Sequence, residues 1–358
     1  MSPVRCTRCI LPDNYPGITF DAEGVCNYCA SYRAPAYLGA DALRDKIQSF
    51  INARSNNNTD YDCVIGLSGG RDSSYLLYYF VKVLGLRVVA YCADNGFMPE
   101  QTKINMQNMA ELMDVELVVE GHNYQNRCVR QHIKAWMKRP SPGMVGMVCT
   151  GCRLAMDVEL ARFVRERNIP VLAVGTAPMD RESFKKKILS NDRSDTSSRA
   201  MMRGYLSEVA ANPRWIVHPA CLVTQLQEFY HHYYHGRLRR RRLENVMAIA
   251  PFDRYVRWEE AEIESKIQTE LNWMKHPGTE STWRGDCDIA LLKLYMYKKT
   301  LGYNDKDEGL SFLVRDGQLS RDEAMSRLQK EGDIADDLIE DLFDDLGLSF
   351  SELQASLA

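Results

Sequence analysis

The residues from Ser68 to Ser74 spell Ser-Gly-Gly-Arg-Asp-Ser-Ser and stand between an apolar run of strand length, 63–67, and a run suited to a helix, 75–84. A turn of this kind aims several backbone N–H groups at one point, where the helix dipole also favours an anion. The two glycines let the backbone approach a ligand closely and adopt positive φ. The serine hydroxyls add donors, and the carboxylate of Asp72 can hold Mg2+, which itself holds phosphate oxygens. The sequence therefore predicts a phosphate-binding turn.

The spacing in this turn differs from two common phosphate-binding motifs. It lacks the Gly-Lys-Ser/Thr of kinase-type P-loops and the Gly-x-Gly-x-x-Gly of dinucleotide-binding proteins. The pattern Ser-Gly-Gly-x-Asp-Ser at 68–73 resembles the pyrophosphate loop of the PP-loop ATP pyrophosphatase superfamily. Members of that superfamily cleave ATP between the α and β phosphates and adenylate a substrate oxygen. The alternative is an ordinary strand-to-helix turn that carries serines, and Arg71, at the variable position of the motif, has no assigned role.

The resemblance implies ATP and Mg2+ as cofactors and a role for several strand ends. Ser68, Asp72 and Ser73 would be catalytic, the serines by bonding phosphates and Asp72 by holding the metal. Residues 93–94 would border the adenine and ribose, and Gly175 would belong to a second nucleotide loop after a later strand. The expected nucleotide-contacting residues are Leu67, Ser68, Gly69, Gly70, Asp72, Ser73, Ser74, Ala93, Asp94 and Gly175.

Two Cys-x-x-Cys pairs lie near the N-terminus, Cys6 with Cys9 and Cys26 with Cys29, and 16 residues separate them. This spacing lies in the window of four-thiolate zinc sites. Four soft ligands would close a tetrahedron around Zn2+ and leave no open position, which predicts a structural site. The alternatives are free thiols in an unstructured N-terminus and a redox-active pair.

The sequence around these cysteines carries a narrower resemblance. Ile-Leu-Pro follows the first pair, and Pro-Gly-Ile-x-Phe-Asp-x-x-Gly precedes the second. This is similar to the opening of the N-acetyl sugar amidotransferases, PP-loop enzymes of surface-polysaccharide and lipopolysaccharide biosynthesis. Residues 315–324 spell Arg-x-Gly-x-x-Ser-Arg-x-Glu-Ala and resemble the same family. The resemblance implies that nitrogen replaces the acetyl oxygen of an N-acetylated, nucleotide-linked sugar. Because the chain shows no glutaminase motif, a separate glutaminase partner would supply ammonia.

A third Cys-x-x-Cys pair, Cys149 with Cys152, comes directly before a run suited to a helix, 154–167. Such a pair can be redox-active, metal-binding or inert. The arrangement resembles the PP-loop tRNA thiolation enzymes, in which this pair and one later cysteine hold a [4Fe–4S] cluster. The resemblance implies Cys287 as the third ligand, with Cys221 as the alternative, and leaves one iron open for sulfide. A second zinc site and packing thiols are the other interpretations. Sulfur transfer to a tRNA or a small molecule is therefore the competing function, and only there is a nucleic-acid partner expected.

Strand-like runs at 86–92, 115–119 and 171–176 alternate with helix-like runs, which predicts a doubly wound, largely parallel sheet. The resemblance to the PP-loop superfamily implies a sheet of the adenine nucleotide α-hydrolase type. Cys63 and Cys92 fall inside the predicted strands and are expected in the core. We divide the chain into a zinc ribbon (1–35), a PP-loop ATP-binding domain (36–235) and a C-terminal helical domain (236–358).

Composition limits the classes of partner. The 358 residues are 45% hydrophobic and 26% charged, enough for a sizeable core, and the net charge is −3. No overall basic field therefore recruits nucleic acid. The sequence shows neither an apolar run of ~20 residues nor a signal peptide. Eleven cysteines then favour a reducing compartment and metal ligation, so a cytoplasmic protein without a membrane partner is expected. A non-catalytic scaffold, in which the ribbon and helices bind proteins, is a third hypothesis.

Three polar segments are less specific. The stretch 181–203 is rich in charge, and its lysines at 185–187 suit either a lid over phosphates or a solvated face. The histidines at 231, 232 and 235 invite a metal site as one interpretation. An interfacial helix is the preferred interpretation. The arginine-rich run 237–242 suits phosphate or an acidic partner.

Overall fold

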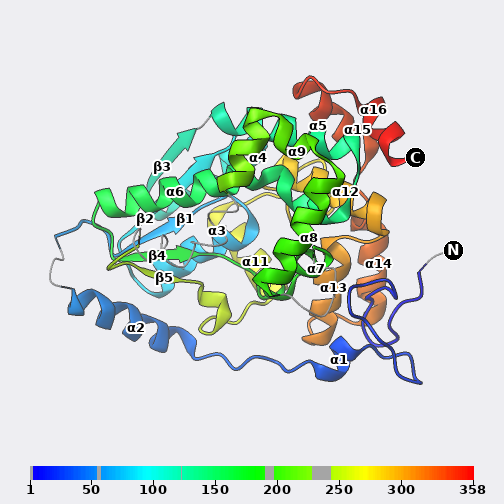
Figure 1. Cartoon of the computed structure of the whole chain (residues 1–358). Helices are drawn as coiled ribbons and strands as arrows, with labels where there is room; N and C mark the ends of the chain where they lie inside the picture. The colour runs from blue at the N-terminus through cyan, green and yellow to red at the C-terminus, as the bar shows by residue number, and fades with distance from the viewer. Residues whose placement is uncertain (1–2, 55–57, 122, 190–196, 228–242) are drawn as a thin grey trace.

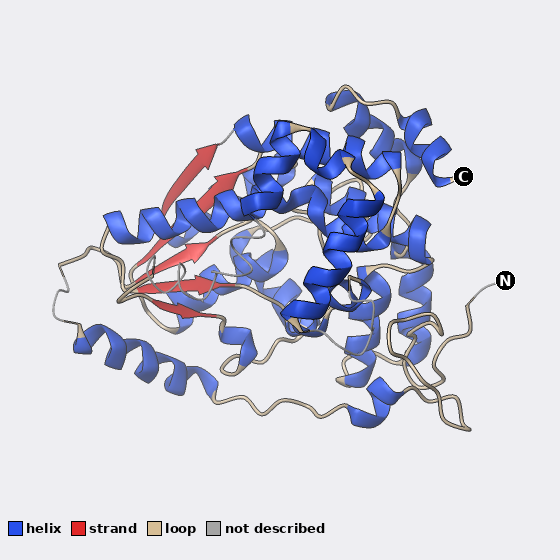
Figure 2. Cartoon of the chain, in the orientation of Figure 1, coloured by secondary structure: helices blue, strands red, loops and turns tan. Residues whose placement is uncertain are grey.

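The structure is a computed structural model that describes residues 3–54, 58–121, 123–189, 197–227 and 243–358. Its centre is a five-stranded sheet in the order β3-β2-β1-β4-β5 (Figure 1, Figure 2). All four strand pairs are parallel. The strands are β1 Cys63–Gly66, β2 Val88–Asp94, β3 Glu116–Gly121, β4 Val171–Val174 and β5 Met247–Ile249. The predicted α/β class with a parallel sheet is confirmed.

Helices connect the strands and form the C-terminal part of the chain. They include α1 Asn27–Ser31, α2 Gly39–Ala53, α3 Arg71–Tyr78, α4 Glu100–Met113, α5 Asn123–Lys138, α6 Thr150–Glu166, α7 Phe184–Ile188, α8 Ser198–Ala211, α9 Arg214–Val217, α11 Glu260–Leu271, α12 Asp288–Leu301, α13 Asp305–Arg315, α14 Arg321–Glu331, α15 Asp336–Asp345 and α16 Phe350–Leu357. Helical segments of other types are the π-helix η1 Tyr79–Val83 and the 3-10 helices η2 Pro142–Cys149, η3 Pro178–Glu182 and η4 Pro251–Asp253. Within the described ranges, no helix has the length and apolar character needed to cross a membrane.

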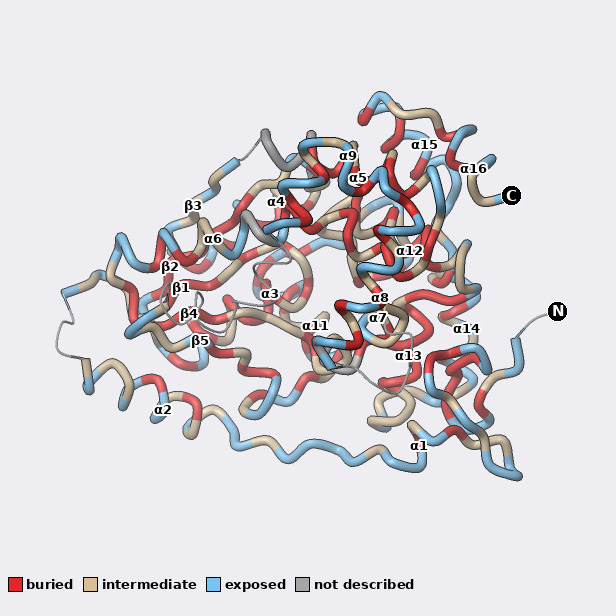
Figure 3. The backbone as a smooth tube through the Cα atoms, viewed as in Figure 1, coloured by how far each residue is buried: buried red, intermediate tan, exposed pale blue. Residues whose placement is uncertain are grey.

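Both faces of the sheet are covered, because successive side chains of a strand point to opposite faces and both sets are apolar here. One face packs Cys63, Ile65, Ala90, Cys92 and Ala173 against residues of α3, α4 and α11. The other packs Val64, Val89, Tyr91 and Leu172 against Phe163 and Val164 of α6. Figure 3 shows the resulting buried centre of the sheet. Cys63 and Cys92 are core residues, as predicted.

The strand order reverses between β1 and β4, which lie side by side at the centre of the sheet. In open parallel sheets, ligands bind beyond the carboxyl ends of the strands at such a reversal. The segment after β1 is the predicted phosphate-binding turn, and the segment after β4 begins at Gly175. The topology therefore brings the two predicted nucleotide loops to one crevice.

The N-terminal segment, residues 3–33, packs against the C-terminal helices rather than standing apart (Figure 1). Arg5 lies 2.8 Å from the carboxylate of Asp307. Arg321 donates to the backbone carbonyls of Cys6 and Cys9, both at 3.1 Å. The hydroxyl of Tyr32 donates to Asp316. The two ends of the chain that carry the amidotransferase-like motifs are therefore in direct contact.

Some elements differ from the sequence prediction at their limits. The helix expected from 154 begins at Thr150, so the Cys-x-x-Cys pair spans its first turn. Ser320 and Glu323 form a capping box at the start of α14. The sheet takes its fifth strand, β5, from the region assigned to the C-terminal helical domain. The division into three domains stays a prediction.

Removing the ion pair of Arg5 should destabilise the fold. Arg5→Met leaves the carboxylate of Asp307, whose side chain is 0% exposed, buried without its cation. Breaking a buried pair costs about 3 kcal/mol, which denaturant unfolding followed by circular dichroism would measure. The matched control is Arg44→Met, because Arg44 pairs with Asp41, whose side chain is 93% exposed, and exposed pairs contribute less than ~1 kcal/mol. Equal losses of stability in the two variants would contradict the packing of the N-terminal segment against α13.

Candidate functional site

The hydroxyl groups of the phosphate-binding turn are ordered by its own backbone. Ser68 Oγ lies 3.1 Å from Ser73 Oγ and accepts a bond from Gly70 N–H at 3.3 Å. Ser73 Oγ accepts from Ser68 N–H and donates to the carbonyl of Gly70. Ser74 Oγ also donates to that carbonyl, at 2.7 Å, and is fully buried. Ser68 and Ser73 therefore face the crevice, whereas Ser74 holds the turn from below.

Two glycines allow the close packing of this turn. Gly69 has φ +73°, and a Cβ there would lie 2.8 Å from the carbonyl oxygen of Thr102. A Cβ on Gly175 would lie 2.9 Å from the carbonyl oxygen of Asp72 and 3.0 Å from the amide nitrogen of Ser73. The segment after β4 thus passes directly against the start of α3, which only glycine permits.

Arg71 holds the turn from behind. Its guanidinium donates to Glu260 at 2.8 Å and to Thr282 at 3.0 Å. It lies 4.9 Å from the ring centroid of Trp258 and 5.3 Å from that of Trp283. Trp258 Nε1 in turn donates to Asp72 Oδ1 at 2.9 Å. Asp72 is therefore fixed by a tryptophan from the C-terminal half of the chain.

The turn opens into a cavity of about 770 Å³, counting its mouth, which we call the phosphate cavity. It is lined by Ser68, Gly70, Arg71, Asp72, Ser73, Gly175, Ala177, Met179, Asp180, Thr282, Trp283, Arg284, Asp286, Asp305, Lys306 and Glu308. A Cβ on Gly70 would lie 2.9 Å from Asp286 Oδ2, so this carboxylate stands beside the turn, as Asp72 does. Carboxylate oxygens are the ligands that Mg2+ prefers, and Asp72 and Asp286 are suited to hold it.

Another wall of the phosphate cavity is formed by Arg284 and the first turn of α13. Arg284 pairs with Asp180 at 2.7 Å and with Asp305 at 3.5 Å, and Lys185 pairs with the same oxygen of Asp305 at 2.6 Å. Burial lowers the pKa of Lys306 to about 7 and raises the pKa of Glu308 to about 7. This wall therefore combines ion-paired groups with two buried groups that change protonation near neutral pH.

A second cavity, of about 1260 Å³, lies beyond the ends of β1, β2 and β4, and we call it the cysteine cavity. Its apolar side is formed by Gly66, Leu67, Ala93, Met98, Met156, Leu160 and Val174. Ser68, Arg284 and Asp286 line both this cavity and the phosphate cavity. Leu67 and Ala93, two of the residues expected to contact the nucleotide, therefore line this cavity. Asp94 does not line it; its carboxylate accepts from Gly96 N–H at 2.7 Å.

The structure brings Cys149, Cys152 and Cys287 together, since all three line the cysteine cavity. Burial acts to raise the pKa of Cys149, but the ammonium of Lys293, 3.1 Å from its sulfur, outweighs burial and lowers it. Burial, followed by the charges of Cys149 and Cys287, raises the pKa of Cys152. Cys221 lines no part of this cavity and is fully buried. The geometry therefore selects Cys287 over Cys221 as the partner of the Cys-x-x-Cys pair.

These three sulfurs do not converge as the ligands of one small ion do. Among the described side chains, the thiols within 4.8 Å of one another that could hold a metal are those of the N-terminal pairs. Ligands of a tetrahedral zinc must be close together, whereas the cysteines of a four-iron cluster bind separate irons and stand further apart. Cys149, Cys152 and Cys287 therefore do not form the close set of ligands that a second zinc needs.

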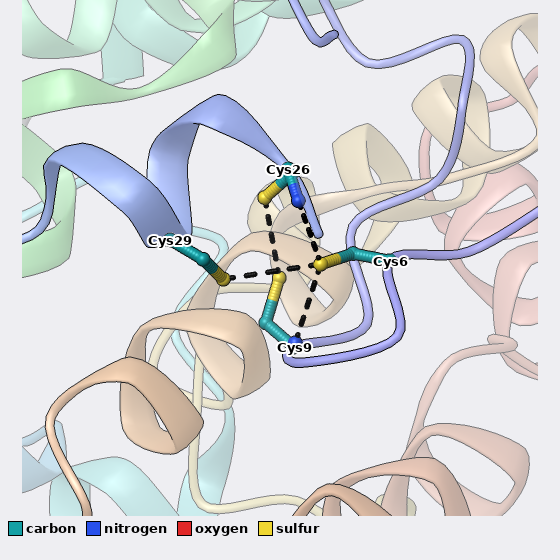
Figure 4. Close-up of side chains that lie close together, drawn as sticks. All are labelled: Cys6, Cys9, Cys26 and Cys29. Carbon is teal, nitrogen blue, oxygen red and sulfur yellow. Dashed lines mark hydrogen bonds between the residues drawn. The ribbon is translucent and has the colours of Figure 1, made fainter. Parts of the chain in front are cut away.

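The N-terminal pairs form the centre shown in Figure 4. The sulfurs of Cys6 and Cys29 are 3.9 Å apart, and those of Cys9 and Cys26 are 3.8 Å apart. A tetrahedron with metal–sulfur bonds of ~2.3 Å has edges of about 3.8 Å. The sulfur of Cys6 also accepts from the backbone N–H groups of Cys9 and Cys26, at 3.4 and 3.2 Å. The four thiols are thus already placed to close around one metal ion.

A third cavity, of about 1370 Å³, adjoins the other two and lies among η2, α7 and α8. It shares Asp180 and Arg284 with the phosphate cavity, and Arg153 and Arg284 with the cysteine cavity. Its other lining residues are Gly143, Gly146, Met147, Ser183, Lys185, Lys186, Leu189, Met201, Met202, Tyr205 and Tyr297. Arg284 is therefore the point at which all three cavities meet.

The three polar segments noted in the sequence have different outcomes. Lys185 is ion-paired with Asp305, and Lys187 donates to Tyr28 at 2.8 Å. The lysine run is thus tied to α13 and to the N-terminal segment. The predictions for the histidines at 231–235 and the arginines at 237–242 fall outside the described residues.

Sequence patterns missed several residues of the site, namely Asp286, Arg284, Lys293, Asp305, Lys306 and Glu308. They come from the chain beyond residue 280 and meet the phosphate turn only through the fold. The one local signal is the run Trp-Arg-Gly-Asp-Cys-Asp at 283–288, which contains Cys287, the implied third ligand.

Comparison with known proteins gives weak similarities. No protein-family model matches the chain, and no curated protein matches it. A solved NMN synthetase from Francisella tularensis is similar with a TM-score of 0.29 and 15% identity, over 39% of this chain and 56% of that one. The U34-tRNA thiolase NcsA from Methanococcus maripaludis, solved with its [4Fe-4S] cluster, has a TM-score of 0.31 and 14% identity, over 89% of this chain and 88% of that one. At these scores neither similarity identifies the activity of this chain.

The N-terminal centre should hold one metal ion. Purified protein is expected to contain one tetrahedrally bound divalent ion at this centre, and Cys26→Ser should lose it, because three thiolates no longer close the tetrahedron. Elemental analysis by mass spectrometry would measure the content. Cys63→Ala is the control, since Cys63 is a core cysteine far from any ligand set. Retention of the ion in Cys26→Ser would contradict the assignment.

Proposed function

We propose that the chain is an ATP-dependent adenylating enzyme of the PP-loop type. It would cleave ATP to AMP and pyrophosphate and transfer AMP to a carbonyl or amide oxygen, which is then replaced. The observation that carries this proposal is the shared boundary of the phosphate and cysteine cavities at Ser68, Arg284 and Asp286. One molecule can span that boundary, with its phosphates at the turn and its adenosine against Leu67 and Ala93.

The chain's own residues would act by electrostatics. An amide oxygen is a poor leaving group, and adenylation turns it into one that a weak nucleophile can displace. Backbone N–H groups at the start of α3, together with Ser68 and Ser73, would bind the charge that develops on pyrophosphate. Mg2+ held by Asp72 and Asp286 would neutralise phosphate charge. Arg284 would face the α-phosphate side, where the cavities meet.

The acceptor would occupy the cavity among η2, α7 and α8. That cavity has an apolar part, which includes Met201, Met202 and Tyr205, and a cationic part at Lys185 and Arg284. It opens toward the phosphate cavity, where the acceptor oxygen would meet ATP. A small amphipathic acceptor with an anionic group suits this lining better than a neutral one.

Nitrogen transfer is the first candidate for the replacement step. It follows from the sequence similarity to N-acetyl sugar amidotransferases at both ends of the chain, which the fold packs together. The acceptor would then be an N-acetylated nucleotide sugar, and ammonia would come from a glutaminase partner.

Sulfur transfer is the second candidate, and one observation favours it. Cys149, Cys152 and Cys287 line one cavity beside the adenosine position. Three thiolates there would hold a [4Fe–4S] cluster with one iron open, and the group would supply a site for sulfide. In both candidates the N-terminal centre is a structural zinc site that supports α13 and α14. The scaffold hypothesis predicts neither activity.

Asp72→Asn should separate an enzyme from a scaffold. The native protein is expected to form AMP and pyrophosphate from ATP with ammonium chloride and UDP-N-acetylglucosamine, or with sulfide in place of ammonium. Asp72→Asn should lower this rate by about 10²–10³-fold, because metal charge on the phosphates is lost. Coupled detection of pyrophosphate would measure it. Asp62→Asn is the control, since Asp62 pairs with Arg87 at the opposite end of β1. Unchanged pyrophosphate release in Asp72→Asn would remove the proposed function.

Iron analysis should separate the two candidates. If the cysteine cavity holds a cluster, protein purified without oxygen will be brown, and Cys287→Ala will lose iron because one ligand is gone. Cys221→Ala is the matched control and should keep its iron. Colourless native protein that turns over with ammonium would exclude the cluster and leave nitrogen transfer.

A further inference from the structure

Glu308 is a buried carboxylate that lines the phosphate cavity together with Ser68 and Asp72. The hydroxyl of Tyr15 donates to its Oε1, and Phe184 N–H donates to the same oxygen at 3.0 Å. Because both bonds end on Oε1, Oε2 is the oxygen left to meet a ligand in the cavity. Glu308 is thus oriented in the way expected of a group that exchanges a proton with a bound molecule.

The donor, Tyr15, is part of the loop that joins the two N-terminal cysteine pairs. It lies between the two cysteine pairs, and its backbone closes turns with Pro12 and Ile18 at 3.0 and 3.1 Å. Its ring is 4% exposed and packs against Tyr28, Phe184 and Tyr303, with ring centroids 5.3, 6.2 and 5.7 Å away. The hydroxyl therefore cannot turn away from Glu308 unless the loop between the cysteine pairs moves.

The other acids of the phosphate cavity are committed elsewhere. Asp180 and Asp305 are paired with Arg284 and Lys185, while Asp72 and Asp286 suit the metal. Within the described residues, Glu308 forms no ion pair, and the burial described above places its pKa near neutrality. It is the acid of this cavity best able to take up a proton.

We propose that Glu308 accepts the proton in the transfer step and that Tyr15 positions it, so that the N-terminal metal centre controls the protonation of the active site. The proposal rests on the proposed function. In the transfer step a carbon–nitrogen bond forms between ammonia and the carbon that bears the adenylated oxygen. The carbon–oxygen bond to AMP breaks, and AMP leaves with the electron pair. One proton of the attacking nitrogen passes to Glu308 Oε2. With hydrogen sulfide, a carbon–sulfur bond forms, and the S–H proton takes the same path.

The direction of the pH dependence follows from the groups around Glu308. Burial is the largest effect and raises the pKa of Glu308, and the charge of Asp305 raises it further. The hydrogen bond from Tyr15 and the charge of Lys185 lower that pKa. Tyr297, whose own pKa is raised by burial and by nearby acids, also faces it. A base acts when deprotonated, so turnover should rise with pH through about 7. Loss of the Tyr15 hydroxyl removes a bond that favours the carboxylate, which moves this rise to higher pH.

Tyr15→Phe tests the link without changing the packing of the ring. Its matched control is Tyr32→Phe, which also removes a bond from the N-terminal segment to a carboxylate, that of Asp316, outside the cavities. Two measurements are made: turnover against pH with ATP, ammonium chloride and UDP-N-acetylglucosamine, and infrared titration of Glu308, taken as the difference between native protein and Glu308→Gln. The second needs no acceptor.

The expected results are specific to the positioning role. Glu308→Gln should lower kcat by about 10²–10³-fold with the KM for ATP nearly unchanged. Tyr15→Phe should lower kcat by about tenfold at neutral pH and recover at higher pH, and it should add nothing to Glu308→Gln. Chelation of the N-terminal metal should shift the Glu308 titration upward in native protein but not in Tyr15→Phe. Tyr32→Phe should behave as native protein.

An unshifted titration of Glu308 in Tyr15→Phe overturns the positioning role, and native turnover in Glu308→Gln overturns the catalytic one. If native protein releases no pyrophosphate from ATP with this acceptor, with either ammonium or sulfide, the proposed function fails and takes the catalytic role with it. The infrared titration still decides the link between Tyr15 and Glu308. The two failures are therefore distinguishable.

Discussion

A single buried guanidinium, that of Arg71, holds the phosphate turn in place. It is 4% exposed, and it joins the start of α3 to Glu260 of α11 and to the rings of Trp258 and Trp283. Removing an arginine from water is costly, and the cost is offset only where several acceptors and aromatic faces meet it. Burial acts to raise the pKa of Glu260, but Arg327 and Arg71 outweigh it and hold that pKa below its usual value. Both Glu260 and Arg71 therefore stay charged. A turn fixed in this way presents its N–H groups to phosphate without reorganising, which is the condition under which electrostatic catalysis is strong.

The second constraint is the segment 282–287, which supplies residues to all three cavities where they meet. Arg284 has φ +61°, a left-handed conformation that a residue with a side chain adopts only when its surroundings enforce it. Its neighbours lie in different surroundings: Asp286 stands beside Gly70, and Cys287 lines the cysteine cavity, as Cys152 does. The sulfur of Cys287 also accepts from Asn95, at 3.4 Å. A few consecutive residues therefore connect the lining of the cysteine cavity to that of the phosphate cavity.

The sequence identified the features of this site that are local in the chain. A turn whose glycines and serines are adjacent, and cysteine pairs three residues apart, carry their geometry in their spacing. The strands β1, β2 and β4 could be placed because continuous apolar runs leave few alternatives. Glu308 and Lys293 could not be identified, because nothing within their own segments marks them. Each acquires its partner only through long-range packing, which places Glu308 beside Tyr15 and Lys293 beside Cys149. Arg71 was missed for a related reason: its partners lie about 190 positions further along the chain.

The charge of the attacking molecule distinguishes the two proposed reactions, nitrogen transfer and sulfur transfer. Ammonia attacks as a neutral molecule and gains nothing from a site lined by cations. Sulfide and thiolates are anions, and they are stabilised where burial makes nearby positive charges strong. The cysteine cavity places Lys293 3.1 Å from Cys149, and Arg153 and Arg284 also line it. A cavity of this kind favours a bound anion, whether a thiolate or the sulfide of a cluster. Nitrogen transfer on this scaffold would need ammonia to reach the acceptor by a path outside the cysteine cavity. One such path passes Trp283 and Lys306, where a smaller cavity shares both residues with the phosphate cavity.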